Sequence, residues 1–320
     1  MNVYLTFDVE IWCGGWAALD ANFPASFERY VYGRSRHGDY ALPATLDIME
    51  RHGVKGIFFV EPLFSARFGA SHLATIVELI QRRGHSVQLH LHPEWTDEIR
   101  PPPIEAASTK RQHLIHYSQA EQTALIGFGK RLLAEAGAHD ITTFRAGSFA
   151  ADRATFAALA ANDLRTDSSL NECYAVSGVG IESNGAWAGA QRHRVGEVVS
   201  YPVSVFRDGL GRLRPAHLTA CSLAELRAAI DAAHAGGYDE FVIVSHNFEL
   251  LKPGSADPDR WMVRRFEGLC AFLRSRSSTL DTSPPMRHRA ALGLPAAGRA
   301  AVPLHATARR FAEQTLRRFA

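Results

Sequence analysis

Short runs of apolar, β-branched and aromatic residues recur along the chain, each brief enough to form a buried strand. They predict seven strands, at residues 3–8, 56–60, 86–91, 141–144, 164–167, 197–203 and 241–246. Between them, apolar positions repeat with helical spacing over residues 44–52, 72–83, 118–136 and 150–161. Strands that alternate with helices in this way predict parallel strands joined by right-handed crossovers.

The ends of the predicted helices carry recognisable signals. Gly53, Gly84 and Gly137 follow three of the helical patterns, where glycine commonly ends a helix in the left-handed conformation. Ser222 with Glu225 predicts a capping box that opens another helix, which ends at the Gly-Gly pair 236–237. The pattern therefore indicates an α/β fold, either a barrel or a doubly wound sheet, and does not choose between them.

Composition excludes several classes of protein. The chain has 320 residues, 46% of them hydrophobic and 21% charged, which is typical of a globular protein and excludes disorder, collagen and coiled coil. A net charge of +2 argues against a dedicated nucleic-acid binder. No apolar run approaches the roughly 18 residues that a membrane-spanning helix needs.

Cysteine usage and the N-terminus suggest a location. Four scattered cysteines without a Cys-x-x-Cys pair argue against a zinc finger, a thioredoxin-like motif or a disulfide scaffold. The first residues pass directly into an alternating strand pattern, without the basic and apolar regions of a signal peptide. We therefore expect a cytoplasmic protein with reduced thiols.

Charge is distributed unevenly along the chain. Residues 281–320 carry seven arginines and two acidic residues, a net charge of +5, which leaves −3 for residues 1–280. We predict a catalytic domain over 1–280, a Pro/Ala/Gly-rich linker over 281–303, and a basic amphipathic helix or tail over 304–320. Leu304, Ala308 and Phe311 share one helical face. This pattern suits peripheral contact with an anionic membrane, or equally a helix docked on the body or a disordered tail.

Titratable residues follow two of the predicted strands at their carboxyl ends. Asp8 and Glu10 are two residues apart, so they point to the same side of an extended chain and could share a cation. His90 and His92 likewise share a face, before Pro93 ends the strand. Two imidazoles and one carboxylate are typical ligands of a catalytic zinc ion, which keeps a fourth position for water.

Three more strands end in polar or aromatic residues. Arg145 lies in Phe-Arg-Ala at 144–146, Asp167 precedes two serines, and His246 is followed by Asn247. Because the loops at the carboxyl ends of parallel strands converge in α/β folds, we expect these groups to meet at one site.

These motifs, in this order, resemble those of the polysaccharide deacetylases, the NodB-homology or carbohydrate esterase 4 family. The resemblance rests on Thr-Phe-Asp-x-Glu (6–10), Gly-His-x-x-x-x-His-x-His-Pro (84–93), Phe-Arg-Ala-x-x-Phe (144–149), Asp-Ser-Ser (167–169) and Val-Ser-His (244–246). It covers residues 1 to about 250. It implies a distorted (β/α)7-type barrel, here with a basic C-terminal extension, and one divalent metal ion, with Zn²⁺ expected first and Co²⁺, Ni²⁺ or Mn²⁺ as alternatives.

The resemblance also implies metal ligands. Glu10 matches the position of the ligand carboxylate, and His90 and His92 match the two histidine ligands. Many family members space the histidines four apart, and that register here gives His90 and Glu94, so Glu94 is the alternative to His92.

Four residues match catalytic roles in the family. Asp8 matches the general base and Arg145 the arginine that pairs with it and lowers its pKa. His246 matches the general acid, and Asp167 is expected to hydrogen-bond His246 and favour its protonated form. An amide has a poor leaving group, so separate base and acid groups suit its hydrolysis.

The resemblance implies a metal-dependent hydrolase. We expect it to remove an acetyl group from an N-acetylated sugar in a glycan, lipopolysaccharide-core or glycolipid precursor. The alternatives are hydrolysis of another linear or cyclic amide on the same scaffold, or an inactive carbohydrate-binding relative. We expect Trp12, Trp95, Phe149 and Asn247 to bind the substrate, although the aromatic residues could be core and Asn247 could satisfy backbone groups. No protein partner can be identified from the sequence.

Overall fold

A computed structural model describes residues 1–105, 109–181, 192–282, 285–290 and 298–318. The chain forms two compact units, each built from segments distant in sequence. Unit 1 comprises residues 1–56, 204–284 and 294–320, and unit 2 comprises residues 57–203 and 285–293. Much of the predicted linker, 281–303, lies outside the described residues, and the division into catalytic domain, linker and tail stays a prediction.

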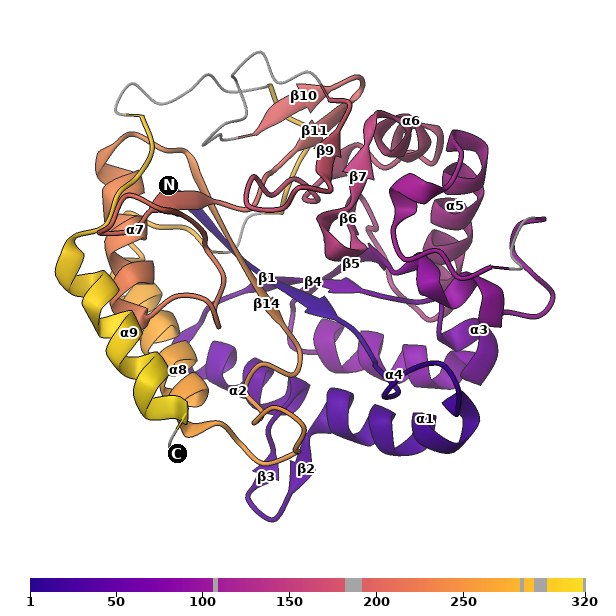
Figure 1. Cartoon of the computed structure of the whole chain (residues 1–320), viewed down its shortest axis with the longest axis horizontal. Helices are drawn as coiled ribbons and strands as arrows, with labels where there is room; N and C mark the ends of the chain where they lie inside the picture. Colours follow the sequence, from indigo (N-terminus) through magenta and orange to yellow (C-terminus); the bar gives the residue numbers. More distant parts are fainter. Residues whose placement is uncertain (106–108, 182–191, 283–284, 291–297, 319–320) are drawn as a thin grey trace. The chain divides into compact units, whose positions relative to one another are not determined.

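Unit 1 is built around a pair of parallel strands, with helices packed beside them (Figure 1). Strand β1 lies next to β14 in register from Asn2 opposite Glu240 to Asp8 opposite His246. All residues of β1 except Asn2 are buried, which agrees with the almost continuous apolar run. The elements of unit 1 are β1 (Asn2–Val9), α1 (Leu19–Phe27), η1 (Glu28–Tyr32), β2 (Arg34–Ser35), β3 (Gly38–Asp39), α2 (Leu42–His52), β12 (Val205–Arg207), β13 (Leu213–Pro215), α7 (Leu223–Ala235), β14 (Glu240–His246), α8 (Arg260–Ser275) and α9 (Leu304–Arg318).

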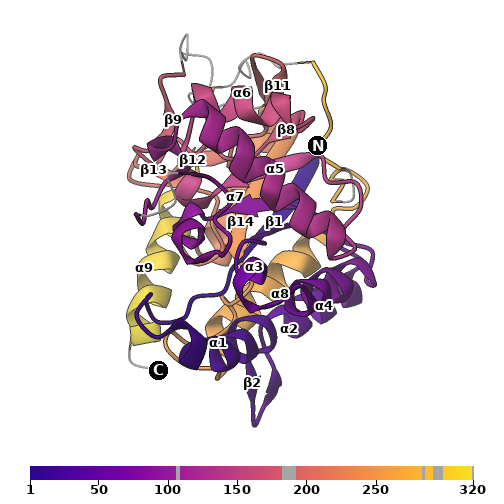
Figure 2. The ribbon, with the colours of Figure 1, turned by 90° about the vertical axis from the view of Figure 1, so that its right-hand side faces the viewer.

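Unit 2 contains six neighbouring strands, in the order β10-β11-β8-β6-β5-β4. All adjacent pairs are parallel except β10 with β11, an antiparallel edge that the sequence analysis did not predict. Helices α5 and α6 pack against each other in this unit (Figure 2). Its elements are β4 (Gly56–Val60, starting at the last residue of unit 1), α3 (Ser65–Phe68), α4 (Ala70–Gln81), β5 (Ser86–Leu91), η2 (Pro93–Glu98), η3 (Leu114–His116), α5 (Gln119–Glu135), β6 (Thr143–Ala146), η4 (Gly147–Phe149), β7 (Ala151–Asp152), α6 (Arg153–Ala161), β8 (Thr166–Asp167), β9 (Ser177–Val179), β10 (His193–Val195) and β11 (Val198–Ser200).

The predicted helix signals are confirmed. Ser118 caps α5, and its side chain accepts from the backbone of Glu121 while the Glu121 carboxylate accepts from the backbone of Ser118. Ser222 and Glu225 form the same capping box at α7. Gly53 ends α2 in the left-handed conformation, which costs glycine little because it lacks Cβ. These local interactions fix where the crossovers turn back toward the strands.

Two helices of unit 1 were not predicted. Helix α1 has Pro24 inside it, which obscures its pattern, because proline removes a backbone donor from the helix. Helix α8 begins after Asp259, whose carboxylate accepts from the backbone of Trp261 and Met262. Its Phe266 is buried and packs edge-on against Phe7 of β1, with ring centroids 5.7 Å apart. Burial of an aromatic side chain of this size stabilises the fold by about 1.5–3 kcal/mol.

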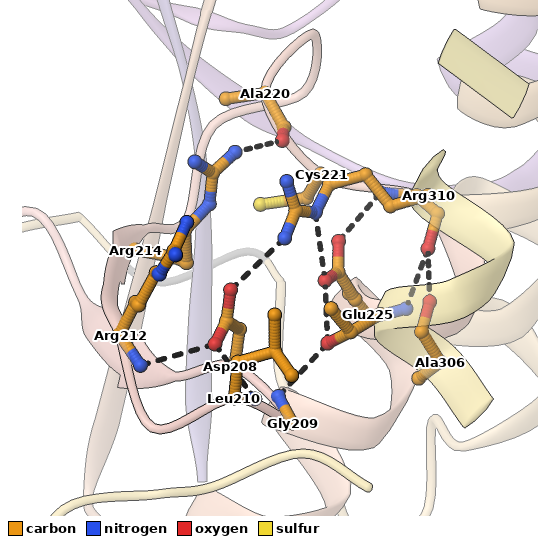
Figure 3. Close-up of polar contacts among 12 residues, drawn as sticks. Asp208, Gly209, Leu210, Arg212, Arg214, Ala220, Cys221, Glu225, Ala306 and Arg310 are labelled. Carbon is orange, nitrogen blue, oxygen red and sulfur yellow. Dashed lines mark hydrogen bonds and ion pairs between the residues drawn. The ribbon is translucent and has the colours of Figure 1, made fainter. Parts of the chain in front are cut away.

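Within unit 1, helix α9 is held against the other elements by buried ion pairs (Figure 3). The Arg310 guanidinium donates to Asp208 and to Glu225, each over 2.9 Å, and all three side chains are buried. The apolar positions Leu304, Phe311 and Leu316 are exposed instead. The helix therefore docks through the face that carries Ala306, Thr307 and Arg310, whereas the three large apolar side chains point to solvent.

Within the part of the chain that the structure describes, none of the four cysteines, Cys13, Cys173, Cys221 and Cys270, takes part in a disulfide. Among the described residues, no helix is both long enough and apolar enough to cross a membrane.

Candidate active site

Strands β1 and β14 place two carboxylates and an imidazole together in unit 1. Asp8 lies opposite His246 in the parallel register, and Glu10 follows two residues later on the same side. One oxygen of each carboxylate and a nitrogen of His246 all lie within 4.8 Å of one another. Both carboxylates are buried, so the charges interact in a medium that screens them less than water does. The predicted convergence of the first and last strands is confirmed.

Asn247 holds the segment that carries Glu10. The backbone N–H of Glu10 donates to Asn247 Oδ1 over 3.0 Å, and Asn247 Nδ2 donates to the backbone oxygen of Glu10 and to that of Tyr30. Asn247 is fully buried. Because its side-chain amide is used by backbone groups, this geometry gives Asn247 a positioning role in place of the expected contact with substrate.

Glu249 is the carboxylate that orients His246. Nδ1 of His246 lies 2.7 Å from Glu249 Oε1, and the other oxygen of Glu249 accepts from Ser245 Oγ over 2.8 Å. His217 Nε2 lies 3.1 Å from the same Oε1, and Thr219 contacts the Nδ1 of His217. Glu249 is thus buried between two imidazoles and shares its charge with both.

The surroundings favour the charged form of His246. Burial by itself would lower the pKa of His246, but the hydrogen bond with Glu249 and the charges of Glu10, Glu249 and Asp8 raise it to about 9. Burial would raise the pKa of Glu249, and the charges and hydrogen bonds of His217 and His246 lower it well below its usual range. At neutral pH, His246 is therefore a protonated imidazole able to give up a proton.

Asp167 does not have the role that the sequence analysis expected. Its carboxylate accepts from the backbone and hydroxyl of Ser169 and from Ser200 Oγ, and it is fully buried. Burial raises the pKa of Asp167 to about 6, although these hydrogen bonds lower it. The expected hydrogen bond between His246 and Asp167 was wrong, because Nδ1 of His246 contacts Glu249 instead. Asp167 of the Asp-Ser-Ser motif thus links β8 to β11 through the hydroxyl of Ser200.

In unit 2, His90 and His92 are held in one tautomer by their neighbours. Nδ1 of His90 lies 2.8 Å from the backbone oxygen of Arg145, and Nδ1 of His92 lies 3.0 Å from Glu94 Oε2. Each acceptor requires a proton on Nδ1, so Nε2 carries the lone pair that a metal ion needs. The two rings are 4.9 Å apart and nearly perpendicular. This donor set fits a divalent cation.

The contacts of His92 and Glu94 bear on which of the two is the metal ligand. Glu94 is buried and hydrogen-bonds His92, the arrangement in which a carboxylate orients a ligating histidine. Gly147 leaves room for the His92 ring, because a Cβ there would come within 2.7 Å of it. The geometry favours His92 as a ligand and gives Glu94 the supporting role.

Arg145 is fully buried beside the histidines. It lies on β6 opposite His90, and its guanidinium donates to the backbone oxygen and hydroxyl of Ser168. The same group lies over the ring of Phe59, 4.2 Å from the centroid. These contacts fix its direction, and its pairing with Asp8 stays a prediction.

The aromatic residues expected to bind substrate differ in exposure. Trp95 is 2% exposed and packs edge-on against Phe68, so it belongs to the core of unit 2, and the expected sugar platform was wrong there. Phe149 is also buried and packs against Tyr174, which is 43% exposed. Trp12 is partly exposed and donates to Glu10 Oε2 over 2.7 Å. Trp12 and Tyr174 are thus more accessible than Trp95 and Phe149.

Sequence reasoning missed Glu249 and His217. Glu249 stands three residues after His246, a spacing at which side chains meet in a helical turn, and this was the available signal. His217 lies far away in sequence and reaches Glu249 only through the bridge between His217 and Val244 of β14. No local pattern marks that pairing.

Comparison with solved structures identifies the fold. A presumed polysaccharide deacetylase from Mycobacterium smegmatis superposes with a TM-score of 0.52 and 20% sequence identity, covering 89% of this chain and 93% of that one. This chain has the fold of the polysaccharide deacetylases. The expected α/β fold class, of the distorted barrel type, is confirmed.

Two more distant similarities concern the same family. A family 4 carbohydrate esterase from Streptomyces lividans, solved with acetate, matches with a TM-score of 0.42 and 14% identity over 94% of this chain and 97% of that one. A family 4 pseudoenzyme from Bacillus anthracis matches with a TM-score of 0.42 and 11% identity over 87% and 62% of the two chains. No protein-family model and no curated protein sequence matches the chain. A polysaccharide deacetylase fold does not by itself establish activity, which depends on the site.

Proposed function

We propose that the protein hydrolyses the N-acetyl group of a sugar, with one divalent cation, Zn²⁺ in the first instance, held by Glu10, His90 and His92. When bound, such a cation polarises a carbonyl group and makes water more acidic. The proposal is supported by the tautomers of the two histidines, which expose Nε2 lone pairs, and by the burial of all three side chains.

The chain's own residues perform the two proton transfers. Asp8 removes a proton from the attacking water. His246 donates its proton to the nitrogen of the departing amine, and Glu249 stabilises the imidazolium before that transfer. Each transfer contributes on the order of 10²–10⁴-fold to the rate. The observation that supports this division is the unequal environment of the groups: Asp8 is a buried carboxylate, and His246 is an imidazole whose pKa is raised to about 9.

The substrate class that we propose is an N-acetylated sugar in a glycan, lipopolysaccharide-core or glycolipid precursor. Trp12 supports a saccharide because it presents an accessible indole beside Glu10, and indole faces pack well against sugar rings.

Acetate release tests the proposal. Purified protein loaded with Zn²⁺ or Co²⁺ is incubated with a panel of N-acetylated sugars and glycolipids, and acetate is measured together with ammonia and ring-opened products. We expect acetate from at least one substrate. If no substrate yields acetate, the proposed function is wrong, and ring-opened product would instead identify a cyclic amide as the substrate.

Two variants distinguish the general base, Asp8, from a metal ligand, His90. Asp8→Ala is expected to abolish acetate release and to keep its metal, because the base need not bind the cation. His90→Ala is expected to lose the metal, since it removes a nitrogen ligand. Elemental analysis of both purified variants measures this difference, and equal metal content would contradict the two assignments.

A further inference from the structure

A groove of about 1000 Å³ lies in unit 1, apart from the carboxylates and histidines described above. Its lining residues come from the β2–β3 hairpin, the loop before α8, the first turns of α8 and the end of α9. A second hollow of about 180 Å³ shares His37, Pro258, Arg260 and Arg264 with it, so the two are continuous. The combined space is large enough for more than one sugar ring.

The walls of the groove are strongly basic. Five cationic side chains against two carboxylates line it, which leaves an excess of three positive charges; the cations are Arg36, Lys252, Arg260, Arg264 and Arg317. One of the two acids, Asp259, is already occupied, since it caps α8 and accepts from Arg317. The groove thus presents more cationic charge than its own acids neutralise.

Arg260 and Arg264 are the cations best placed for a ligand. Both are exposed, and among the residues that the structure describes neither is paired with a carboxylate. They stand four apart on α8, so they lie on the same face of the helix. Guanidinium groups bind phosphate through paired N–H donors, which favours phosphate over a neutral ligand.

Trp261 adds an apolar surface to the same groove. Its side chain is partly exposed next to Arg260, where an indole face can pack against a sugar ring. The loop that forms one wall begins directly after His246 and is closed by the bridge between Leu251 and Pro258. Arg29 braces this loop by donating to the backbone oxygen of Ser255. The groove is therefore built on the loop that leaves the catalytic strand.

We propose that this groove binds a phosphate-bearing saccharide, with the phosphate on Arg260 and Arg264 and a sugar ring on Trp261. The inference deepens the proposed function, on which it rests, by assigning the substrate to phosphorylated N-acetyl sugars. The protein then discriminates between neutral and phosphorylated sugars by charge at this groove.

Equilibrium binding tests the groove without requiring turnover. N-acetylglucosamine 1-phosphate and neutral N-acetylglucosamine are titrated into the full-length protein by isothermal calorimetry. We expect the phosphorylated sugar to bind at least about tenfold more tightly, and the preference to weaken at high salt. The double variant R260Q/R264Q is expected to lose the preference and to bind both sugars alike.

A matched double variant controls for the loss of two charges. R153Q/R309Q removes two exposed arginines outside the groove, and Arg153, like Arg260, is the first residue of a helix. This control is expected to keep the full preference, with both variants showing the wild-type circular dichroism spectrum. A preference that survives in R260Q/R264Q, or that is lost equally in the control, overturns the proposal.

Two further arms separate related outcomes. Vesicles containing phosphatidylglycerol replace the sugar, and vesicle binding that depends on Arg260 and Arg264, without sugar phosphate binding, overturns the assignment to a saccharide. Acetate release from the neutral and phosphorylated sugars is measured in parallel. Arginine-dependent binding without acetate release retains the groove and rejects the proposed function. Acetate release with equal kcat/KM for both sugars, and equal affinity, rejects only the groove.

Discussion

Among single residues, Glu249 has the most direct influence on the chemistry of the site. Its carboxylate contacts His246 and His217, and it keeps the imidazole of His246 charged at neutral pH. A general acid works only while it holds its proton, so the proposed role of His246 predicts that activity is lost as pH rises through its pKa. The pH at which activity falls therefore tests whether Glu249 raises the pKa of His246.

We predict that Glu249→Gln lowers the pKa of His246, because the amide keeps a hydrogen bond but removes the negative charge. The alkaline limb of the kcat/KM profile should move to lower pH by about one unit or more, with activity retained on the acid side. Glu267→Gln, a partly exposed glutamate on α8 that pairs with Arg51, is the control and should leave the profile unchanged. An unchanged alkaline limb in Glu249→Gln would show that another group supplies the proton.

The choice between His92 and Glu94 as metal ligand gives a second prediction for single residues. His92→Ala should lose most of the bound metal, whereas Glu94→Gln should bind it about 10- to 100-fold more weakly, because Glu94 only orients the imidazole. Competition against a coloured chelator measures both affinities. If Glu94→Gln loses the metal and His92→Ala keeps it, the ligand is Glu94.

Single residues also show what sequence alone could determine about the site. Period-two alternation places Asp8 and Glu10 on one side of the first strand, His246 ends the last strand, and their convergence was predicted. The partner of His246 was not, because Asp167 and Glu249 are both acids near motif residues and only the folded backbone decides which one reaches Nδ1.

At the scale of elements, helix α9 shows how buried charge can override an apolar pattern. Leu304, Ala308 and Phe311 share a face that predicted a contact surface, yet all three are exposed. The docked face carries Arg310, because Asp208 and Glu225 are buried carboxylates that need a cation (Figure 3). Sequence periodicity identifies a face and gives no information about buried charges elsewhere. Contact of α9 with a membrane stays a prediction.

We predict that Arg310→Ala destabilises the protein by about 3–5 kcal/mol, because it leaves two buried carboxylates without their cation. Arg309→Ala, on the exposed neighbouring position, should change stability by no more than about 0.5 kcal/mol. Urea unfolding followed by circular dichroism measures both values. Equal midpoints for the two variants would mean that α9 contributes little to the fold.

The elements that sequence predicted are those with local signals. Helices α5 and α7 have capping boxes, and the parallel strands are short apolar runs. Helix α1 was missed because Pro24 interrupts it, and β10 because a short antiparallel edge depends on its neighbour and not on its own residues. Elements could therefore be predicted where their own residues carry a capping box or an apolar run.

For the whole molecule, the α/β fold class could be predicted because alternating strands and helices leave few topologies. The basic groove could not, since it combines the β2–β3 hairpin, the start of α8 and the end of α9, which are distant in sequence. The tail's charge was visible in the composition, but the arginines that line the groove come mainly from other segments. Site residues at strand ends are thus predictable, and surfaces assembled from several loops are not.

Metal binding should be visible in the stability of the whole protein. A ligand that binds only the folded state stabilises it by about 2.7 kcal/mol at a concentration 100 times its Kd. We predict that Zn²⁺ raises the Tm of the native protein, that a chelator reverses the rise, and that His90→Ala removes it. His139→Ala, an exposed histidine of the same unit, should keep the full rise. A Tm that does not respond to Zn²⁺ in the native protein, or that responds equally in His90→Ala, would rule out His90 as a ligand. The reason is that ligand binding to the folded state and the free energy of unfolding are linked.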